Sequence, residues 1–240
     1  MALFSYDGWL FLLRWFHFLA GITWIGLLYY FNFVQTPFFA TAEAPVRTGM
    51  LAGGLVSRAL WWFRWGAMLT FITGWLIILH KITKLGGLAP FFNDSNGWAI
   101  FFGGMLGSLM WFNVWFVIWP AQQVVMASAT QVSKGGQAIA EAASRGQRGG
   151  FASRTNTMLS IPMLFLMGMA SHLPIVVRTT RAGKVWALIL LLVVMAAAEY
   201  NAMVGTTGAG KKMLSTLKGT FWAGFILAAI LYLGLELLLH

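Results

Sequence analysis

The chain has 240 residues, of which 59% are hydrophobic and only 9% are charged, whereas a soluble domain has roughly 25% charged residues, so an ordinary water-soluble domain is excluded. The net charge of +10 comes mainly from basic residues in short loops between apolar stretches, which indicates membrane topology and anionic lipid contact and not nucleic-acid binding. The absence of cysteine excludes disulfides, iron–sulfur clusters, thiolate zinc sites and covalently attached c-type haem.

Six stretches are long and apolar enough to cross a bilayer, which takes about 20 residues in an α-helix. Helices are expected because lipid offers no partners for unpaired backbone groups, and the stretches are too long and too uniformly apolar for barrel strands. We therefore predict an all-α integral membrane protein, a bundle of about six transmembrane helices forming one domain over 1–240. The expected spans are 9–31, 60–79, 98–119, 158–177, 185–204 and 220–239.

The loops carry an uneven distribution of basic residues. Lys and Arg are more frequent in the loops on the side opposite the N-terminus, and we count Arg154 among these loop charges. Because positively charged loops favour the cytoplasm, the far side is expected to be cytoplasmic and both termini periplasmic.

Three histidines are expected in the same half of the membrane. His17 lies about eight residues into the first span, roughly 12 Å deep, and His172 lies about five residues before the end of the fourth, roughly 8 Å deep. His80 stands at the end of the second span. Intramembrane ionisable residues are costly and are functional candidates by default. Two neutral imidazoles at similar depth on different helices are what a six-coordinate haem b requires, and Arg14, one turn from His17, suits a haem propionate.

Other interpretations of these residues stay open. Each histidine is also compatible with a structural hydrogen bond between helices, and a copper site is less favoured because the histidines are dispersed. Glu199 suits a proton relay or a quinone headgroup, but a structural hydrogen bond, with Asn113 as a possible partner, is favoured. The segment 205–211 resembles a phosphate-binding loop, but Lys212 replaces the required Ser or Thr, so no nucleotide binding is expected.

Four sequence blocks resemble the membrane domain of the bacterial membrane-bound urate oxidase (urate hydroxylase) family. The resemblance implies a protein of the bacterial inner membrane that passes electrons to a C-terminal cytochrome c, with His17 and His172 at the family's own histidine positions. The blocks are RWFH at 14–17 with GITWIG at 21–26, WFRW at 62–65, NVWFVIWP at 113–120, and SRTN at 153–156 with LSIPMLFLM at 159–167 and SHLP at 171–174.

The sequence departs from the family pattern at two polar positions. Gly66 follows Trp65 where the family implies a Glu, and Thr155 follows Arg154 where it implies a His, so oxidation of urate itself is in question. These 240 residues also include no cytochrome c domain. The leading hypothesis is a membrane haem b electron-transfer protein that serves a separate cytochrome c.

The alternative hypothesis is a non-catalytic accessory subunit of a larger membrane oxidoreductase or monooxygenase complex. Both hypotheses expect the lipid bilayer and another membrane or electron-transfer protein as partners. A small transporter is less favoured because paired, broken helices in two repeated halves are missing from the sequence.

Overall fold

The computed structural model of the chain describes residues 2–178 and 180–240, which are almost entirely helical and contain no strand. η1 is a 3₁₀ turn, and η2 and η3 are π-helical segments within longer helices. The all-α architecture predicted from the sequence is confirmed. The elements are η1 (Ala2–Phe4), α1 (Tyr6–Tyr29), η2 (Tyr30–Gln35), α2 (Thr36–Thr41), α3 (Ala44–Ala52), α4 (Leu55–Lys84), α5 (Leu88–Phe91), α6 (Ser95–Phe112), η3 (Asn113–Ile118), α7 (Trp119–Ser133), α8 (Ala142–His172), α9 (Arg181–Met203), α10 (Ala209–Ser215) and α11 (Leu217–Leu239).

Five continuous helical segments in the described part of the chain are long and apolar enough to cross a membrane, as expected for a multi-pass membrane protein. Three of them are single helices and two are joined through a π-helical segment. They are Tyr6–Thr41, Leu55–Lys84, Ser95–Ser133, Arg181–Met203 and Leu217–Leu239.

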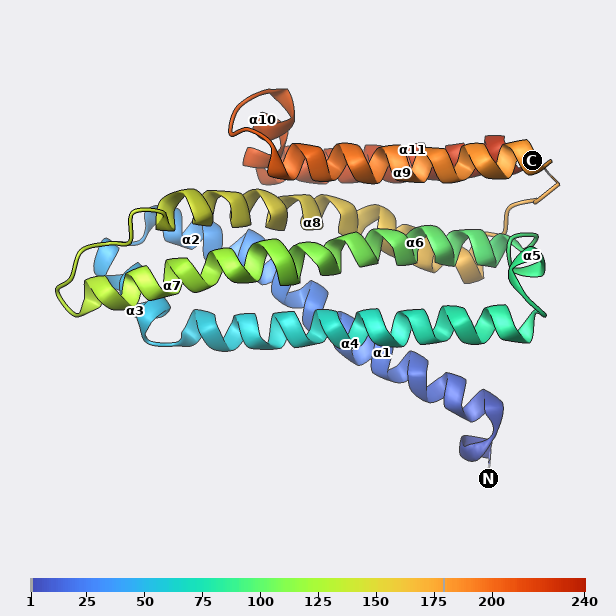
Figure 1. The fold of residues 1–240 in the computed structure, drawn as a ribbon, viewed down its shortest axis with the longest axis horizontal. Coiled ribbons are helices and arrows are strands. Elements are labelled where there is room, and N and C mark those ends of the chain that lie inside the picture. The colour runs from blue at the N-terminus through green and yellow to red at the C-terminus, as the bar shows by residue number, and fades with distance from the viewer. Residues whose placement is uncertain (1, 179) are drawn as a thin grey trace.

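The sixth expected span belongs to α8, which differs from the other long helices. α8 begins in a stretch containing Arg145, Arg148 and Arg154, so its first half is more polar than a membrane span. It lies in the middle of the bundle, where it contacts α1, α6, α7, α9 and α11 (Figure 1). The tertiary structure therefore uses α8 as the central helix around which the apolar spans pack.

The two ends of the bundle are built differently (Figure 1). Both chain termini lie at one end, which we call the terminal end. The short helices α2, α3 and α10 lie at the other end, which we call the loop end.

α1 and α4 pack closely where both helices carry small residues. A Cβ added at Gly66 would lie 3.2 Å from both the Ala20 carbonyl oxygen and the Trp24 amide nitrogen. Small residues allow such backbone approach in membrane helices. Gly66 therefore holds α1 against α4, and this packing sets the position of His17 further along α1.

Candidate functional site

A large groove lies at the terminal end of the bundle, lined by α1, α4, α6 and α8. Its volume is about 940 Å³, and its lining is mostly apolar. Arg14, His17 and His80 all line it. We call it the His17 groove. Three of the four side chains expected around a cofactor are thus brought to one place.

The His17 imidazole is held on α4 by one of its two nitrogens. Its Nδ1 lies 3.1 Å from Thr73 Oγ1, and the Thr73 hydroxyl donates to the Leu69 carbonyl oxygen at 2.7 Å. Because that hydroxyl hydrogen is used, Oγ1 is left to accept from Nδ1–H, which in a neutral ring leaves the lone pair on Nε2. No hydrogen bond joins Nε2 to a described residue. The arrangement therefore leaves one nitrogen of His17 available to a ligand.

Gly74 gives the His17 ring its room. A Cβ at this position would lie 3.0 Å from His17 Cε1 and 3.5 Å from Nδ1, so a larger residue would push the ring away from α4. Gly74 also lines the His17 groove. Thr73 and Gly74 were not predicted from the sequence, because only the register of α1 on α4 brings them to His17.

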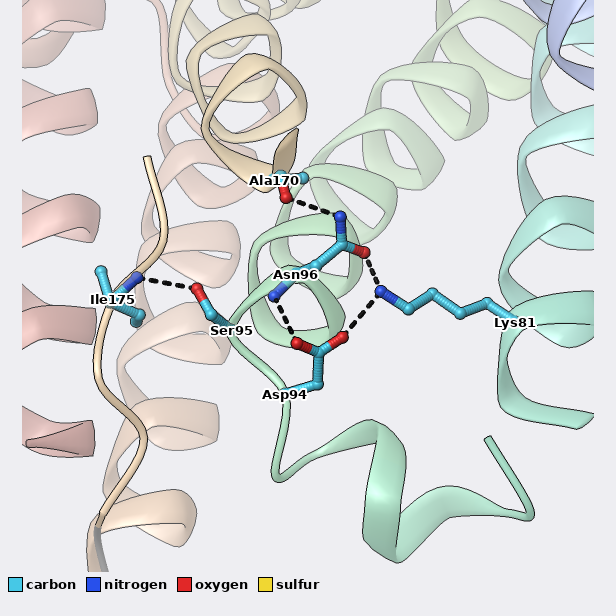
Figure 2. Close-up of polar contacts among 6 residues, drawn as sticks. All are labelled: Lys81, Asp94, Ser95, Asn96, Ala170 and Ile175. Atoms are coloured by element: carbon cyan, nitrogen blue, oxygen red, sulfur yellow. Dashed lines mark hydrogen bonds and ion pairs between the residues drawn. The ribbon is translucent and has the colours of Figure 1, made fainter. Parts of the chain in front are cut away.

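A polar network closes the groove beside α5 (Figure 2). Lys81 Nζ lies 2.8 Å from Asp94 Oδ2 and also donates to Asn96 Oδ1. Asn96 Nδ2 in turn donates to the Ala170 carbonyl oxygen at 2.6 Å. The network connects α4, α6 and α8, and it neutralises the Lys81 charge at the groove wall.

Among the Lys and Arg residues that line the groove, Arg14 has no acidic partner in the described part of the chain. Lys84 pairs with Asp7 at 3.3 Å, and Lys81 is neutralised by its own carboxylate. Arg14 has no ion pair with any described acidic residue. Its exposed guanidinium is thus the lining group best placed to receive an anion.

His80 lies near the outer end of the groove. Its ring stacks on Tyr6 with centroids 3.8 Å apart, and its Nε2 is buried without a partner among the described residues. Within the same residues, no three His, Asp or Glu side chains gather as a metal site would require. His80 is thus held by stacking on Tyr6, whereas His17 is held by a hydrogen bond to Thr73.

His172 does not lie where the sequence analysis placed it. It is the last residue of α8 and is exposed, whereas a position five residues inside a span was expected. α8 ends here because Pro174 disfavours helical backbone at Leu173, which has φ −137° and ψ 76°. The chain continues extended, and the Ile175 N–H donates to Ser95 Oγ at 2.8 Å (Figure 2). His172 does not line the His17 groove.

A second polar group lies within the bundle at the π-helical segment η3. Asn113 Nδ2 lies 3.1 Å from Glu199 Oε2 and 3.0 Å from Asn156 Oδ1, and Asn156 Nδ2 donates to the Met110 carbonyl oxygen at 2.9 Å. The hydrogen bond between Glu199 and Asn113 favoured by the sequence analysis is confirmed. It connects α9 to η3 and α8, which gives Glu199 a structural partner.

The two departures from the family pattern occupy packed positions outside the groove. Gly66 lies against the α1 backbone, which leaves no space for a carboxylate side chain. Thr155 is fully buried, and its Oγ1 has no hydrogen-bond partner among the described residues. Neither residue lines the His17 groove, so neither supplies chemistry there.

Arg154 was expected in a loop, but it belongs to α8 and lines a second cavity. This cavity lies at the loop end, has a volume of about 270 Å³ and shares no lining residue with the His17 groove. We call it the Arg154 cavity. The polar sequence around Arg154 favoured a loop, and sequence spacing alone does not show a cavity.

Comparison with known proteins gives one family. The sequence matches the family described as "Urate oxidase N-terminal" over residues 87–232. No curated protein and no solved structure matches the chain.

Proposed function

Because the chain belongs to the urate oxidase N-terminal family, we propose that it is a membrane haem b protein that passes electrons toward a separate cytochrome c. The observation that carries the proposal is His17, whose Nδ1 is held by Thr73 and whose Nε2 is left for a ligand. A histidine that donates its other ring N–H to a fixed acceptor is the usual arrangement of a metal-binding imidazole.

The residues of the His17 groove fit a haem in three respects. The groove is large and mostly apolar, as a macrocycle with hydrophobic faces requires. Gly74, which has no side chain, lets the imidazole lie close to α4. Arg14 offers an unpaired guanidinium at the same groove, which suits a propionate carboxylate.

Each side chain then has a definite role. His17 would hold the iron through Nε2, Thr73 would fix the ring's tautomer and orientation, and Arg14 would neutralise a propionate. The haem, when bound, takes up and releases one electron. The apolar lining would keep water away from a bound haem, and this burial would influence its reduction potential.

His172 is not assigned an iron-binding role in this proposal. Its exposed position at the end of α8 lies outside the groove lining, whereas Met163, Met167 and His80 belong to that lining. The proposal therefore depends on His17, and His172 serves as the comparison that tests the assignment.

The orientation in the membrane is part of the proposal. The loop end carries the larger share of basic loop residues, so we place it in the cytoplasm of the bacterial inner membrane. The terminal end, with the His17 groove, then faces the periplasm. This places the haem on the side where a periplasmic cytochrome c would collect electrons.

Reduced-minus-oxidised difference spectra of the purified chain test the proposal. We expect a b-type band in the wild type, its loss in His17→Ala, and its retention in His172→Ala. His240→Ala, at the exposed C-terminus, is the matched control for removing an imidazole. A band of wild-type height in His17→Ala would contradict the assignment.

The same spectra separate the second candidate function, an accessory subunit of a larger membrane oxidoreductase or monooxygenase. Its support is that Gly66 and Thr155 lie packed where the family implies ionisable side chains. A wild-type protein isolated with its native partners and lacking any b-type band would favour that alternative over the haem protein.

A further inference from the structure

The Arg154 cavity at the loop end has a composition unlike that of the His17 groove. Its polar lining includes Asn32 and Gln35 from η2, Gln122 from α7, and Ser153 and Arg154 from α8. No acidic side chain lines it. The cavity therefore combines one cation with neutral hydrogen-bonding groups inside the helical bundle.

Arg154 has no partner for its charge. Its side chain is half-buried, and it makes no hydrogen bond or ion pair with any other residue in the described part of the chain. Its Nη1 is fully buried and unpaired. Because one nitrogen of the guanidinium is removed from water, part of this charge is costly to bury unless an anion or several acceptors compensate it. The protein itself supplies neither, so the unpaired charge indicates a ligand.

A second unmet group lies in the same cavity. Gln35 Oε1 is buried without a partner among the described residues. The neighbouring Asn32 is already satisfied, because its Nδ2 donates to the Leu28 carbonyl oxygen at 2.9 Å and to Ser153 Oγ at 2.8 Å. The cavity is thus lined by the unpaired cation of Arg154, whereas the Gln35 oxygen is enclosed by protein atoms and Asn32 and Ser153 are fixed to each other between helices.

We propose that the Arg154 cavity binds a small organic carboxylate. The Arg154 guanidinium would receive the carboxylate, for which its planar fork is suited. The volume of about 270 Å³ lies just below the usual range of roughly 300–1,000 Å³ for ligand pockets, which selects a ligand of few atoms and excludes a macrocycle.

The π-helical segments explain how the chain builds this site. η2 contributes Asn32 and Gln35, and the last residue of η3, Ile118, also lines the cavity. π-helical turns inside α-helices are frequent at functional sites, since the extra residue changes the direction of side chains on a regular helix. Two such segments border the Arg154 cavity from different helices.

Isothermal titration calorimetry on the purified full chain in detergent tests the proposal, with sodium propionate as the probe. Sodium chloride at equal ionic strength is the comparison salt, and phosphatidylglycerol is titrated separately as the lipid comparison. We expect saturable propionate binding that weakens about 10- to 100-fold in Arg154→Gln, the effect of losing a charge-assisted hydrogen bond. Arg148→Gln, an exposed arginine of the same helix, is the matched control and should bind as the wild type does.

Arg154→Lys keeps the proposal testable should Arg154→Gln fail to fold. It retains the positive charge but loses the planar fork, so propionate should bind more weakly than it does to the wild type. The proposal is overturned by absent propionate binding in the wild type, by unchanged binding in folded Arg154→Gln, or by binding of phosphatidylglycerol alone, which would identify a lipid phosphate. Because the b-type spectrum reports only on the His17 groove, failure of either proposal is distinguishable from failure of the other.

Discussion

The two ends of this bundle differ in whether their polar groups have partners within the protein. At the terminal end, Lys81 is neutralised by Asp94, and the imidazole of His17 is fixed by Thr73 inside a large apolar groove. At the loop end, Arg154 lies unpaired in a small cavity lined by both polar and apolar residues. The comparison shows two kinds of site. A ring nitrogen that the protein holds in position, as at His17, suits a largely apolar cofactor. An unpaired cation, as at Arg154, suits a negatively charged ligand.

Between the two ends, Asn113 connects η3 to Asn156 and Glu199. This group contains no unpaired cation, and its carboxylate has an amide donor. It therefore belongs to the structural framework that separates the two sites.

The largest expected effect concerns the contact between Gly74 and the His17 ring. Gly74→Val adds side-chain atoms where a Cβ alone would already lie 3.0 Å from the imidazole, so the ring must shift, and we expect most of the haem to be lost. The ratio of haem to protein in the purified variant measures this. Gly168→Val in α8 is the matched control, because nothing lies within 4 Å of a Cβ there. Full haem content in Gly74→Val would show that haem binding does not depend on the position of the His17 ring beside Gly74.

A smaller effect is expected in the framework between the ends. Asn113→Ala removes two hydrogen bonds and leaves oxygens of Asn156 and Glu199 unpaired inside the bundle. We expect a loss of about 1–2 kcal/mol in stability, given that hydrogen bonds between membrane helices are individually weak. The thermal midpoint in detergent measures it. Glu199→Gln, which keeps an acceptor for Asn113, should be affected less.

The smallest effect is a pH dependence at the loop end. Lys211 is buried, its Nζ donates to the Ala202 carbonyl oxygen at 2.9 Å, and burial together with the Arg148 charge lowers the pKa of Lys211. The unfolded chain then holds more protons than the folded chain just below the ordinary lysine pKa of about 10.4, so stability should rise with pH in that window. Thermal midpoints between neutral and alkaline pH measure this slope. Lys211→Met should reduce it, and Lys212→Met, at an exposed position, should leave it unchanged.

Much of the groove could be predicted from sequence because local periodicity decides it. Arg14 and His17 are three residues apart, so any helix through this stretch presents both on one side. The length and uniformity of the apolar runs similarly predicted the spanning helices. His172 was misplaced because hydropathy continues through 173–177, whereas Pro174 ends the helix whatever the hydropathy.

By itself, the sequence determined an all-helical membrane protein, with a histidine and an arginine on one face of its first span. The tertiary structure decided which residues complete that site, because Thr73 and Gly74 reach His17 only through the register of α4 on α1. It also decided that Arg154 faces a cavity and not a loop. The physical reason is that hydropathy reports the cost of leaving lipid along one helix, whereas the pairing of buried charges depends on what other helices bring alongside.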